Sequence, residues 1–452
     1  MGRIRGKSGS TGITAVLVPI DSECTSDAAG EREILMSVTA GEMKAAAKVA
    51  AAVSPIRWQV VFWLSLGMVV AYIDRVNLTA AMKPMAQVMS LDKAQQGMAF
   101  SAFFWTYTIG QIPAGMLVDR YGVRMLYFIG IVLWSIASAS TVVMGGLAGL
   151  VAVRLMVGLG ESVVTSSSLR YIRTHFEEQK RGLAVGVYMA GTKIGPAIGL
   201  PLAGFLVAQY GWRTMFLALG LGSLLWLGPW MAWVKRDDAA AQPLAAGGSS
   251  AGQRVALGEA LRNPVMWGII VGTYCYMYFV YYCMTWMPQY FQERHGMSIA
   301  KSNWFGGVSF GGMAVVAALA GWAADRMIAR GADPVKVRRG FTIAGFAMAA
   351  TQTLSVFTDS TSLMVFFTVA SLCGLGLATA NYWALTQTLM PGALPVAIQN
   401  TAANLAGVVA PWLTGWMIKQ TGSFDAPIKA LGVWLLLGIG AYSFLVRRRE
   451  TR

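Results

Sequence analysis

Long apolar segments separated by short groups of charged residues make up most of this chain. Each segment has about 20 apolar residues, the length that an α-helix needs to cross the hydrocarbon core of a bilayer. The pattern predicts twelve such helices, at residues 57–82, 94–118, 124–144, 147–171, 181–208, 214–234, 264–290, 301–324, 339–358, 361–390, 393–418 and 428–446. The fold class predicted is therefore an all-α membrane protein.

The twelve segments fall into two groups of six. A stretch at residues 235–263, rich in Ala, Gly and Ser at its start, separates the six-helix bundle predicted at 57–234 from the one predicted at 264–446. Residues 1–56 have no clear period and are predicted to be a disordered tail, unless translation begins at Met36 or Met43. They contain no apolar run with a cleavage site, so they do not read as a secretory signal.

Composition and charge agree with a membrane location. Hydrophobic residues make up 56% of the 452 and charged residues only 13%, whereas soluble domains carry about 25% charged residues. If residue 57 faces the cytoplasm, the Lys- and Arg-rich loops all face it too, and both termini, including residues 447–452, are cytoplasmic. This topology and the anionic inner lipids explain the net charge of +15, so no nucleic-acid partner is needed.

Other cofactor and cross-link chemistry is not expected. The four cysteines lie in the tail or in predicted spans, with no paired framework: Cys24, Cys275, Cys283 and Cys373. His175 and His295 belong to opposite membrane faces, so no metal site, cofactor or membrane-embedded enzyme is predicted.

A repeated motif relates the two halves. "GMLVDRYGVRM" follows the second span and "GWAADRMIARG" follows the eighth, and such repeats are typical of transporters that rock around a central site. The chain here resembles the major facilitator superfamily, whose loop pattern G-x-x-x-D-R-x-G-x-R begins at Gly115. The resemblance implies a gating role at the cytoplasmic ends for Asp119 and Arg120, and for the equivalent Asp325 and Arg326.

Charged residues inside the first span are costly. Asp74 and Arg75 lie in "VVAYIDRVNLTAAM", and a charge at a helix centre costs about 2.5–3.5 kcal/mol on insertion scales, so both must face protein or a wet cavity. Adjacent residues point about 100° apart around a helix, so we expect each to have a different partner. Arg154 and Glu161, two turns apart on one face of the fourth span, are the candidate partners.

Lys193 in the fifth span completes a set of five ionisable groups in the first half. Their net charge is +1 when all are ionised and +3 when Asp74 and Glu161 are protonated, which favours movement of an anion together with protons. The alternative for any one pair is a structural role that fixes helix register. Lys193 could instead extend to the interface along its own stem.

The second half offers hydrogen-bonding and aromatic groups. They are Tyr274, Tyr278, Tyr281 and Tyr282 in the seventh span, Asn381, Trp383 and Gln387 in the tenth, and Asn400 and Asn404 in the eleventh. These side chains suit hydroxyl groups or a planar body on a substrate whose carboxylate is held by basic residues. Packing or an interfacial aromatic belt is the alternative for the tyrosines.

"YIDRVNL", "FFWTYTIGQIPAGMLVDRYG", "RLMVGLGES" and "TWMPQYF" together resemble the anion:cation symporter family of organic-acid carriers. The resemblance implies that Asp74 and Glu161 couple protons and that Arg75 and Arg154 bind the acid. It implies further substrate contacts by Tyr72, Tyr107, Trp383 and Asn404. Thr192 and Lys193 depart from the family pattern, which leaves room for a second carboxylate or an aromatic ring on the substrate.

The sequence thus predicts a monomeric secondary active transporter in the bacterial inner membrane. It imports a small organic anion, such as a sugar acid, dicarboxylate or aromatic carboxylate, with protons by alternating access. The predicted binding residues also include Tyr278 and Tyr282. An exporter, an exchanger or a non-transporting sensor with the same fold remains open.

Overall fold

A computed structural model of the chain describes residues 28–234, 257–390 and 392–446. The predictions for residues 1–27, which include Cys24, for residues 235–256 of the linker and for residues 447–452 concern positions outside this part of the chain. Residues from Arg57 onward form one compact unit, to which the following description applies.

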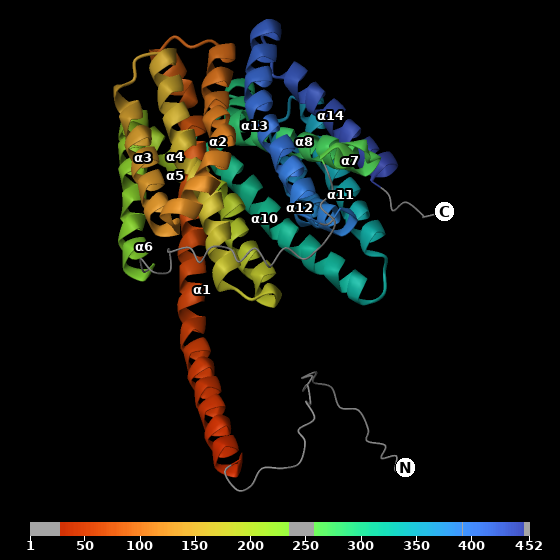
Figure 1. Cartoon of the computed structure of the whole chain (residues 1–452). Coiled ribbons are helices and arrows are strands. Elements are labelled where there is room, and N and C mark those ends of the chain that lie inside the picture. Colours follow the sequence, from red (N-terminus) through yellow and green to blue (C-terminus); the bar gives the residue numbers. More distant parts are fainter. Residues whose placement is uncertain (1–27, 235–256, 391, 447–452) are drawn as a thin grey trace. The chain divides into compact units, whose positions relative to one another are not determined.

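The first half consists of six helical spans. Its elements are α1 (Ala28–Val88), α2 (Lys93–Tyr121), α3 (Val123–Ser140), η1 (Thr141–Val143), α4 (Leu147–His175), α5 (Glu178–Gly222), η2 (Ser223–Trp226) and α6 (Leu227–Trp233). Figure 1 draws them in red to yellow-green. We call this group the N-half.

The second half repeats this arrangement. Its elements are α7 (Leu257–Arg262), α8 (Pro264–Thr285), α9 (Met287–Arg294), α10 (Ile299–Ala329), α11 (Pro334–Ala350), η3 (Thr351–Phe357), α12 (Thr361–Leu389), α13 (Ala393–Thr421), α14 (Asp425–Gly440) and η4 (Ala441–Leu445). They run from green to blue in Figure 1. We call α8 to η4 the C-half.

The helices extend into two segments that were predicted as tail and linker. Helix α1 begins at Ala28, so residues 28–56, predicted to be disordered, belong to this helix. Their alanine-rich sequence explains the difference, because alanine has the highest helix propensity. The predicted linker likewise contains the short helix α7.

The twelve predicted spans are all present. Within the described residues, nine helical stretches are long and apolar enough to cross a membrane, and one of them, Lys180–Trp233, holds two spans. Those two spans meet at Gly211, whose φ of 82° breaks the helical path that α5 otherwise follows and is allowed because glycine has no Cβ. Helices α2 and α13, with 29 residues each, complete the set and pack against each other.

Local sequence fixes where several helices begin. Asp92 and Gln95 form a capping box at the start of α2, in which each side chain accepts the other residue's backbone N–H at 2.9 Å. Asn263 caps α8 by accepting from the backbone N–H of Val265 at 3.0 Å. These caps satisfy backbone donors that would otherwise lack partners at the helix ends.

The two halves meet along α2 with α13 and along α5 with α10. Small residues permit the close approach, since a Cβ on Gly97 would lie 2.6 Å from the carbonyl oxygen of Pro411, and one on Gly307 would overlap Pro201. We call the ends of the spans at the α1–α2 connection the outer ends, following the orientation expected from charge. These contacts lie in the outer portions of the helices.

At its opposite, inner end, helix α2 is not covered by neighbouring side chains. The hydrogen bond from Asn400 Nδ2 on α13 to Gln111 Oε1 on α2, 3.1 Å long, lies nearer the inner ends than the contacts of Gly97. One turn further, a Cβ on Gly115 would meet no atom within 4 Å, and the side chain of Met116 is 68% exposed. The halves are therefore packed together at their outer ends and more loosely at their inner ends.

Candidate functional site

Asp74 is enclosed by hydrogen-bond donors of the N-half. Its Oδ1 accepts from Asn77 Nδ2 at 3.0 Å and from Ser138 Oγ at 3.1 Å. Its Oδ2 accepts from Trp134 Nε1 at 3.1 Å and lies 2.9 Å from Ser223 Oγ. The carboxylate is buried, and its neighbours come from α1, α3 and η2. Such a set of donors satisfies both oxygens of an ionised carboxylate.

Arg75 has an entirely different partner. Its Nε donates to Glu161 Oε2 at 2.7 Å, and both side chains are buried. This ion pair joins α1 to α4. The prediction that Asp74 and Arg75 address different partners is confirmed, and so is the choice of Glu161 as one of them.

Aromatic rings surround the Arg75 guanidinium. Its Cζ lies 4.4 Å from the ring centroids of Tyr72 and Tyr107 and 4.8 Å from that of Phe103. Rings placed this way stabilise the cation through their quadrupoles while its N–H groups at the edge remain available for hydrogen bonds. One of those groups is used by Glu161.

Arg154 also lies next to the Phe103 ring of this aromatic group. Its Cζ is 5.3 Å from the Phe103 centroid, and the side chain is buried. Among the described residues, Arg154 Nε and Glu161 Oε1 have no hydrogen-bond partner. A buried cation and a buried carboxylate oxygen without partners are costly, so this is where a bound anion and a proton would be accommodated best.

Glycines set the spacing of α4 in this region. A Cβ on Gly158 would overlap the carbonyl oxygen of Phe103 on α2, and one on Gly160 would lie 2.9 Å from the backbone of Gly130 and Trp134 on α3. The expectation of close helix approach at both glycines is confirmed. This packing brings Glu161 near α1 and Trp134 near Asp74.

Thr192 and Lys193 occupy neighbouring positions on α5. The Thr192 hydroxyl donates to the carbonyl oxygen of Met189 in its own helix at 2.8 Å. Lys193 is half-buried, and no hydrogen bond or ion pair joins its side chain to the described residues. It lies one turn before Ala197, whose carbonyl packs at Gly307 of α10, so Lys193 belongs to the stripe of α5 that faces the C-half.

The tyrosines of the seventh predicted span, which corresponds to α8, have different neighbours. The Tyr278 ring lies 5.4 Å from Trp434 of α14, inside the C-half, and the buried Tyr282 hydroxyl has no partner among the described residues. Tyr281 instead meets the N-half, with its ring 4.5 Å from Phe104 of α2. The structure thus brings Tyr281, and not Tyr278, next to the α2 aromatic residues.

The remaining C-half candidates lie on α12 and α13. Trp383 is half-buried beside Tyr382, with 5.5 Å between ring centroids, and Asn404 is buried on α13. Asn381 donates to the carbonyl oxygen of Leu377 in its own helix at 2.9 Å. No contact in the described part of the chain joins Trp383 or Asn404 to Arg75 or to the rings around its guanidinium.

The predicted gating residues pair within their own halves. Asp119 forms an ion pair with Arg170 of α4, and Asp325 accepts from Arg338 Nη2 of α11 at 3.1 Å. The Arg120 guanidinium lies 5.3 Å from the Tyr121 ring, and that of Arg326 lies 5.4 Å from Trp322. In this conformation none of the contacts described for these residues crosses between the halves.

Polar contacts that sequence reasoning missed join the outer ends. Lys93 at the start of α2 pairs with Glu293 of α9, and Lys419 Nζ of α13 lies 3.0 Å from Asp92 Oδ2. Gln289 Nε2 donates to Gln96 Oε1 at 3.0 Å and to Glu293 Oε1 at 2.7 Å. We call these residues the outer latch: Asp92, Lys93, Gln96, Gln289, Glu293 and Lys419.

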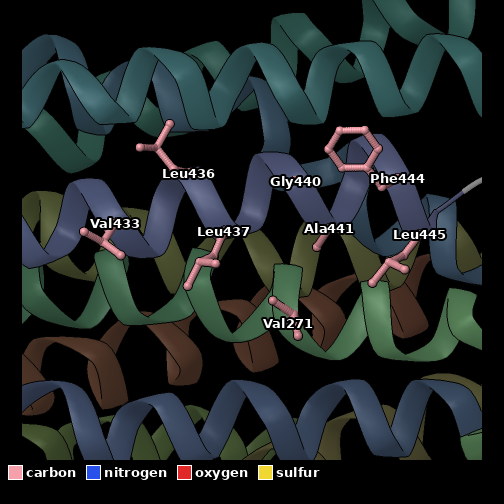
Figure 2. Close-up of a pocket in the computed structure, with 8 residues that line it drawn as sticks. All are labelled: Val271, Val433, Leu436, Leu437, Gly440, Ala441, Phe444 and Leu445. Atoms are coloured by element: carbon pink, nitrogen blue, oxygen red, sulfur yellow. The ribbon is translucent and has the colours of Figure 1, made fainter.

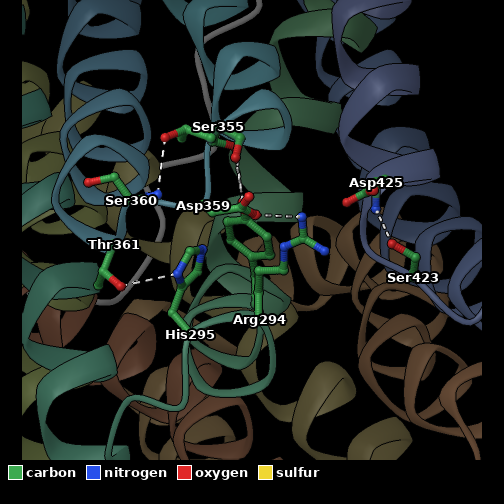
Figure 3. Close-up of polar contacts among 10 residues, drawn as sticks. Arg294, His295, Ser355, Asp359, Ser360, Thr361, Ser423 and Asp425 are labelled. Atoms are coloured by element: carbon green, nitrogen blue, oxygen red, sulfur yellow. Dashed lines mark hydrogen bonds and ion pairs between the residues drawn. The ribbon is translucent and has the colours of Figure 1, made fainter.

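A second polar group at the outer ends stays within the C-half. Figure 3 shows Arg294 near Asp359, at 3.8 Å, and His295 near Thr361, at 3.2 Å. No group of three or more His, Cys, Asp or Glu side chains placed to hold a metal ion occurs among the described residues.

The family model described as the Major Facilitator Superfamily matches residues 64–395. A probable galactarate/D-glucarate transporter of Bacillus subtilis is 26% identical over 86% of this chain and 92% of that protein. A probable L-galactonate transporter of Escherichia coli is 28% identical over 84% of this chain and 87% of that protein. The resemblance to carriers of organic acids, read from the motifs, is confirmed.

Solved structures share the fold. A bacterial homologue of the human lysosomal transporter Spinster, in an inward-facing and occupied conformation, has a TM-score of 0.72 at 17% identity, over 88% of this chain and 99% of that one. A D-xylose–proton symporter has a TM-score of 0.68 at 16% identity, over 86% and 97%. At these identities the likeness concerns the fold alone.

Proposed function

Because this chain belongs to the Major Facilitator Superfamily, we propose that it imports a small organic anion together with protons across the bacterial inner membrane by alternating access. The relatives named above are described as probable transporters of galactarate, D-glucarate or L-galactonate. Sugar acids are therefore the first substrate class that we propose, followed by dicarboxylates and aromatic carboxylates. The protein acts as a monomer with both termini in the cytoplasm, and it catalyses no chemical reaction.

The observation that carries the proposal is the buried Arg75–Glu161 pair next to Arg154. Two arginines and one carboxylate leave an excess positive charge around Phe103. An anion attracted there competes with Glu161 for the Arg75 guanidinium, and Glu161 is released from the pair most easily when it takes up a proton. Substrate binding and protonation therefore favour each other.

After substrate and proton have bound, alternating access requires the two halves to move relative to each other. The outer latch and the α2–α13 and α5–α10 contacts hold the outer ends together, while α2 is open at its inner end. An outward-open state requires these contacts to break and the inner ends to approach. Asp119, Arg120, Asp325 and Arg326 are proposed to form the inner contacts of that second state.

The C-half provides the remaining part of the site. Tyr72, Tyr107, Thr192 and Lys193 line it from the N-half, and Tyr278, Tyr282, Trp383 and Asn404 are proposed to supply hydrogen bonds and stacking from the C-half. Tyr281 joins this set because its ring meets Phe104 at the boundary between the halves.

Reconstitution into proteoliposomes tests the function. A panel of labelled sugar acids, dicarboxylates and aromatic carboxylates is offered with an inwardly directed proton gradient, and accumulation that collapses with a protonophore is expected for at least one acid. Counterflow without a gradient is measured in the same vesicles. Counterflow without gradient-driven accumulation would identify an exchanger, and binding without either would identify a sensor.

A further inference from the structure

The four groups that donate to Asp74 are of two chemical kinds. The Trp134 indole N–H and the Asn77 amide nitrogen, at 3.1 and 3.0 Å, can only donate. The hydroxyls of Ser138 and Ser223, at 3.1 and 2.9 Å, can donate or accept. The enclosure of Asp74 therefore contains two fixed donors and two groups whose direction can reverse.

A protonated Asp74 needs an acceptor within this enclosure. Its carboxyl group carries an O–H in that state, and a buried O–H without an acceptor is costly. Arg154 and Glu161 of α4 are charged groups whose fields reach Asp74, but neither makes a hydrogen bond with it among the described residues. The acceptor must therefore be one of the two serine hydroxyls.

The Ser223 hydroxyl has two acceptors within reach. Its Oγ lies 2.9 Å from Asp74 Oδ2 and 2.9 Å from the carbonyl oxygen of Leu219. A hydroxyl has one hydrogen, so it donates to only one of these oxygens at a time. When Asp74 is ionised, Ser223 can donate to the carboxylate. When Oδ2 carries a proton, the new O–H can donate to Ser223 Oγ while the Ser223 hydrogen turns to Leu219, so every donor keeps an acceptor.

Ser138 has no such alternative. Its other side-chain contact is with a donor, Asn77 Nδ2 at 3.3 Å, and its hydroxyl has no second acceptor among the described residues. A proton on Asp74 Oδ1 that donated to Ser138 would therefore leave the Ser138 hydrogen without an acceptor. The two oxygens of Asp74 thus differ, and Oδ2 is the better position for a proton.

The backbone holds Ser223 next to Asp74. The sixth span changes at Ser223 from an α-helix to the 3-10 helix η2, and such a change within a helix often marks a functional site. Gly220, one turn earlier, permits close contact with α3, because a Cβ there would lie 2.7 Å from the backbone nitrogen of Ala139. This contact brings η2 to the side of α3 that carries Ser138.

The C-half shows that packing alone does not require this arrangement. Its first and last spans, α8 and α14 with η4, also contact each other. Helix α8 contains no Asp, Glu, Lys, Arg or His, and the groove along α14 and η4 that Val271 of α8 helps to form is lined only by apolar side chains (Figure 2). The carboxylate and its reversible hydroxyl are therefore a property of the N-half.

We propose that Ser223 is the positioning residue for the proton carried by Asp74. The proton is held on Oδ2, Ser223 Oγ accepts from it, and the Ser223 hydrogen moves from the carboxylate to the carbonyl oxygen of Leu219. Loss of the proton reverses both hydrogen bonds. This assignment rests on the proposed function, in which Asp74 takes up a proton.

Two alanine variants provide a matched comparison. Ser138→Ala and Ser223→Ala each remove one hydroxyl donor from ionised Asp74, but only Ser223→Ala also removes the acceptor of the protonated state. Gradient-driven accumulation and counterflow are measured in the same proteoliposomes, with the labelled acid of the panel above that the wild type accumulates fastest. The ratio of the initial rate of accumulation to that of counterflow should be at least tenfold lower in Ser223→Ala than in Ser138→Ala.

A second pair of variants separates the hydroxyl from the packing. Ser223→Thr and Ser223→Val have the same shape, and only threonine keeps the hydroxyl. Threonine should retain the wild-type ratio, and valine should lower it tenfold or more. Equal ratios within either pair, or a lower ratio in Ser138→Ala than in Ser223→Ala, would overturn the assignment and leave the transport function intact. Absence of gradient-driven accumulation in the wild type would overturn the proposed function and the assignment with it.

Discussion

Arg75 of α1 and Glu161 of α4 form a buried ion pair of 2.7 Å that leaves the second carboxylate oxygen of Glu161 without a partner among the described residues. A closed pair of this kind opposes binding of a further anion to Arg75. Its rupture by protonation of Glu161 would release the guanidinium, so the same contact can connect proton uptake to substrate binding.

Replacing Arg75 with lysine tests the binding role. An ammonium is a point donor and cannot hold a carboxylate through two parallel bonds or stack among three rings as the planar guanidinium does. We expect Arg75→Lys to raise the apparent dissociation constant of the anion by tenfold or more, equivalent to about 1.4 kcal/mol. Calorimetry measures this, with the exposed Arg213→Lys as control. Equal affinities would remove Arg75 from the binding site.

Neutral substitutes for the two buried carboxylates test proton coupling. Asp74→Asn and Glu161→Gln imitate the protonated state, so the anion should still bind while uptake driven by a pH gradient is lost in both variants. Counterflow should survive in at least one of them. Paired uptake and counterflow measurements in the same vesicles check this, with Glu177→Gln as the exposed control. Gradient-driven accumulation by both variants would place the proton sites elsewhere.

The surroundings of Asp74 add an expectation about stability. An asparagine offers one acceptor oxygen where four donor groups now converge on two, so buried donors lose partners. Unfolding of Asp74→Asn should therefore require about 1–3 kcal/mol less free energy than that of the wild type. Thermal unfolding of the purified variant measures the loss, and a midpoint equal to that of the wild type would contradict the enclosed position.

Replacing Lys193 tests whether the substrate has a second acidic group. It is half-buried on the stripe of α5 that faces the C-half. Lys193→Gln should weaken transport of a dicarboxylate more than transport of the corresponding monocarboxylate, because only the former loses a charge partner. Competition assays with matched pairs of acids measure the ratio, and Lys301→Gln provides an exposed control. Equal losses for both acids would assign Lys193 to structure.

Replacing Asp119 tests the inner gate, which is the set of contacts proposed to form between the inner ends of the two halves. Its ion pair with Arg170 lies within the N-half in the present state, so a gating role requires another partner when the inner ends close. Asp119→Asn should increase labelling of an engineered cysteine from the cytoplasmic side and reduce transport, with substrate affinity changed only modestly. Labelling at the wild-type level would exclude the proposed role of Asp119 in the inner gate.

The outer latch can be tested by exchanging charges. Glu293→Lys alone places a second cation next to Lys93, and their repulsion should separate the outer ends and raise labelling of an engineered cysteine from the outer side. Adding Lys93→Glu reverses the pair and should restore the wild-type level. The pair of Arg294 and Asp359 lies within the C-half, so the same exchange there is a matched control that should have no effect. Failure of the double exchange to restore the wild-type level would show that the pair does not hold the halves together.

The sequence was sufficient for the twelve spans and for naming Glu161, with Arg154, as a candidate partner of the charges in the first span. Buried charges must find partners, and the period of a helix restricts which ones can be reached. The partners of Asp74 were not predicted, because serine and tryptophan side chains such as Ser138, Ser223 and Trp134 occur throughout the spans with no pattern that marks these three.

The sequence also could not predict how α8 is rotated about its own axis, and hence which tyrosine faces which neighbour. This helix is apolar around its whole circumference and mostly buried, so no polar face distinguishes Tyr278, which packs at Trp434, from Tyr281, which meets Phe104. The outer latch was missed for a related reason. Lys93 and Glu293 are 200 positions apart, and only the packing of the two halves brings them together.

The outer latch is made of partly exposed ions, with 23% and 30% of the Lys93 and Glu293 side chains accessible and 50% and 39% of those of Lys419 and Asp92. Attraction between such groups is screened over a Debye length of about 8 Å at 0.15 M salt and about 3 Å at 1 M. High ionic strength should therefore weaken the outer latch and shift the balance between the two proposed states toward the one in which the outer ends separate. The buried Arg75–Glu161 pair is screened much less, so added salt should act on the outer latch without disturbing the candidate binding site.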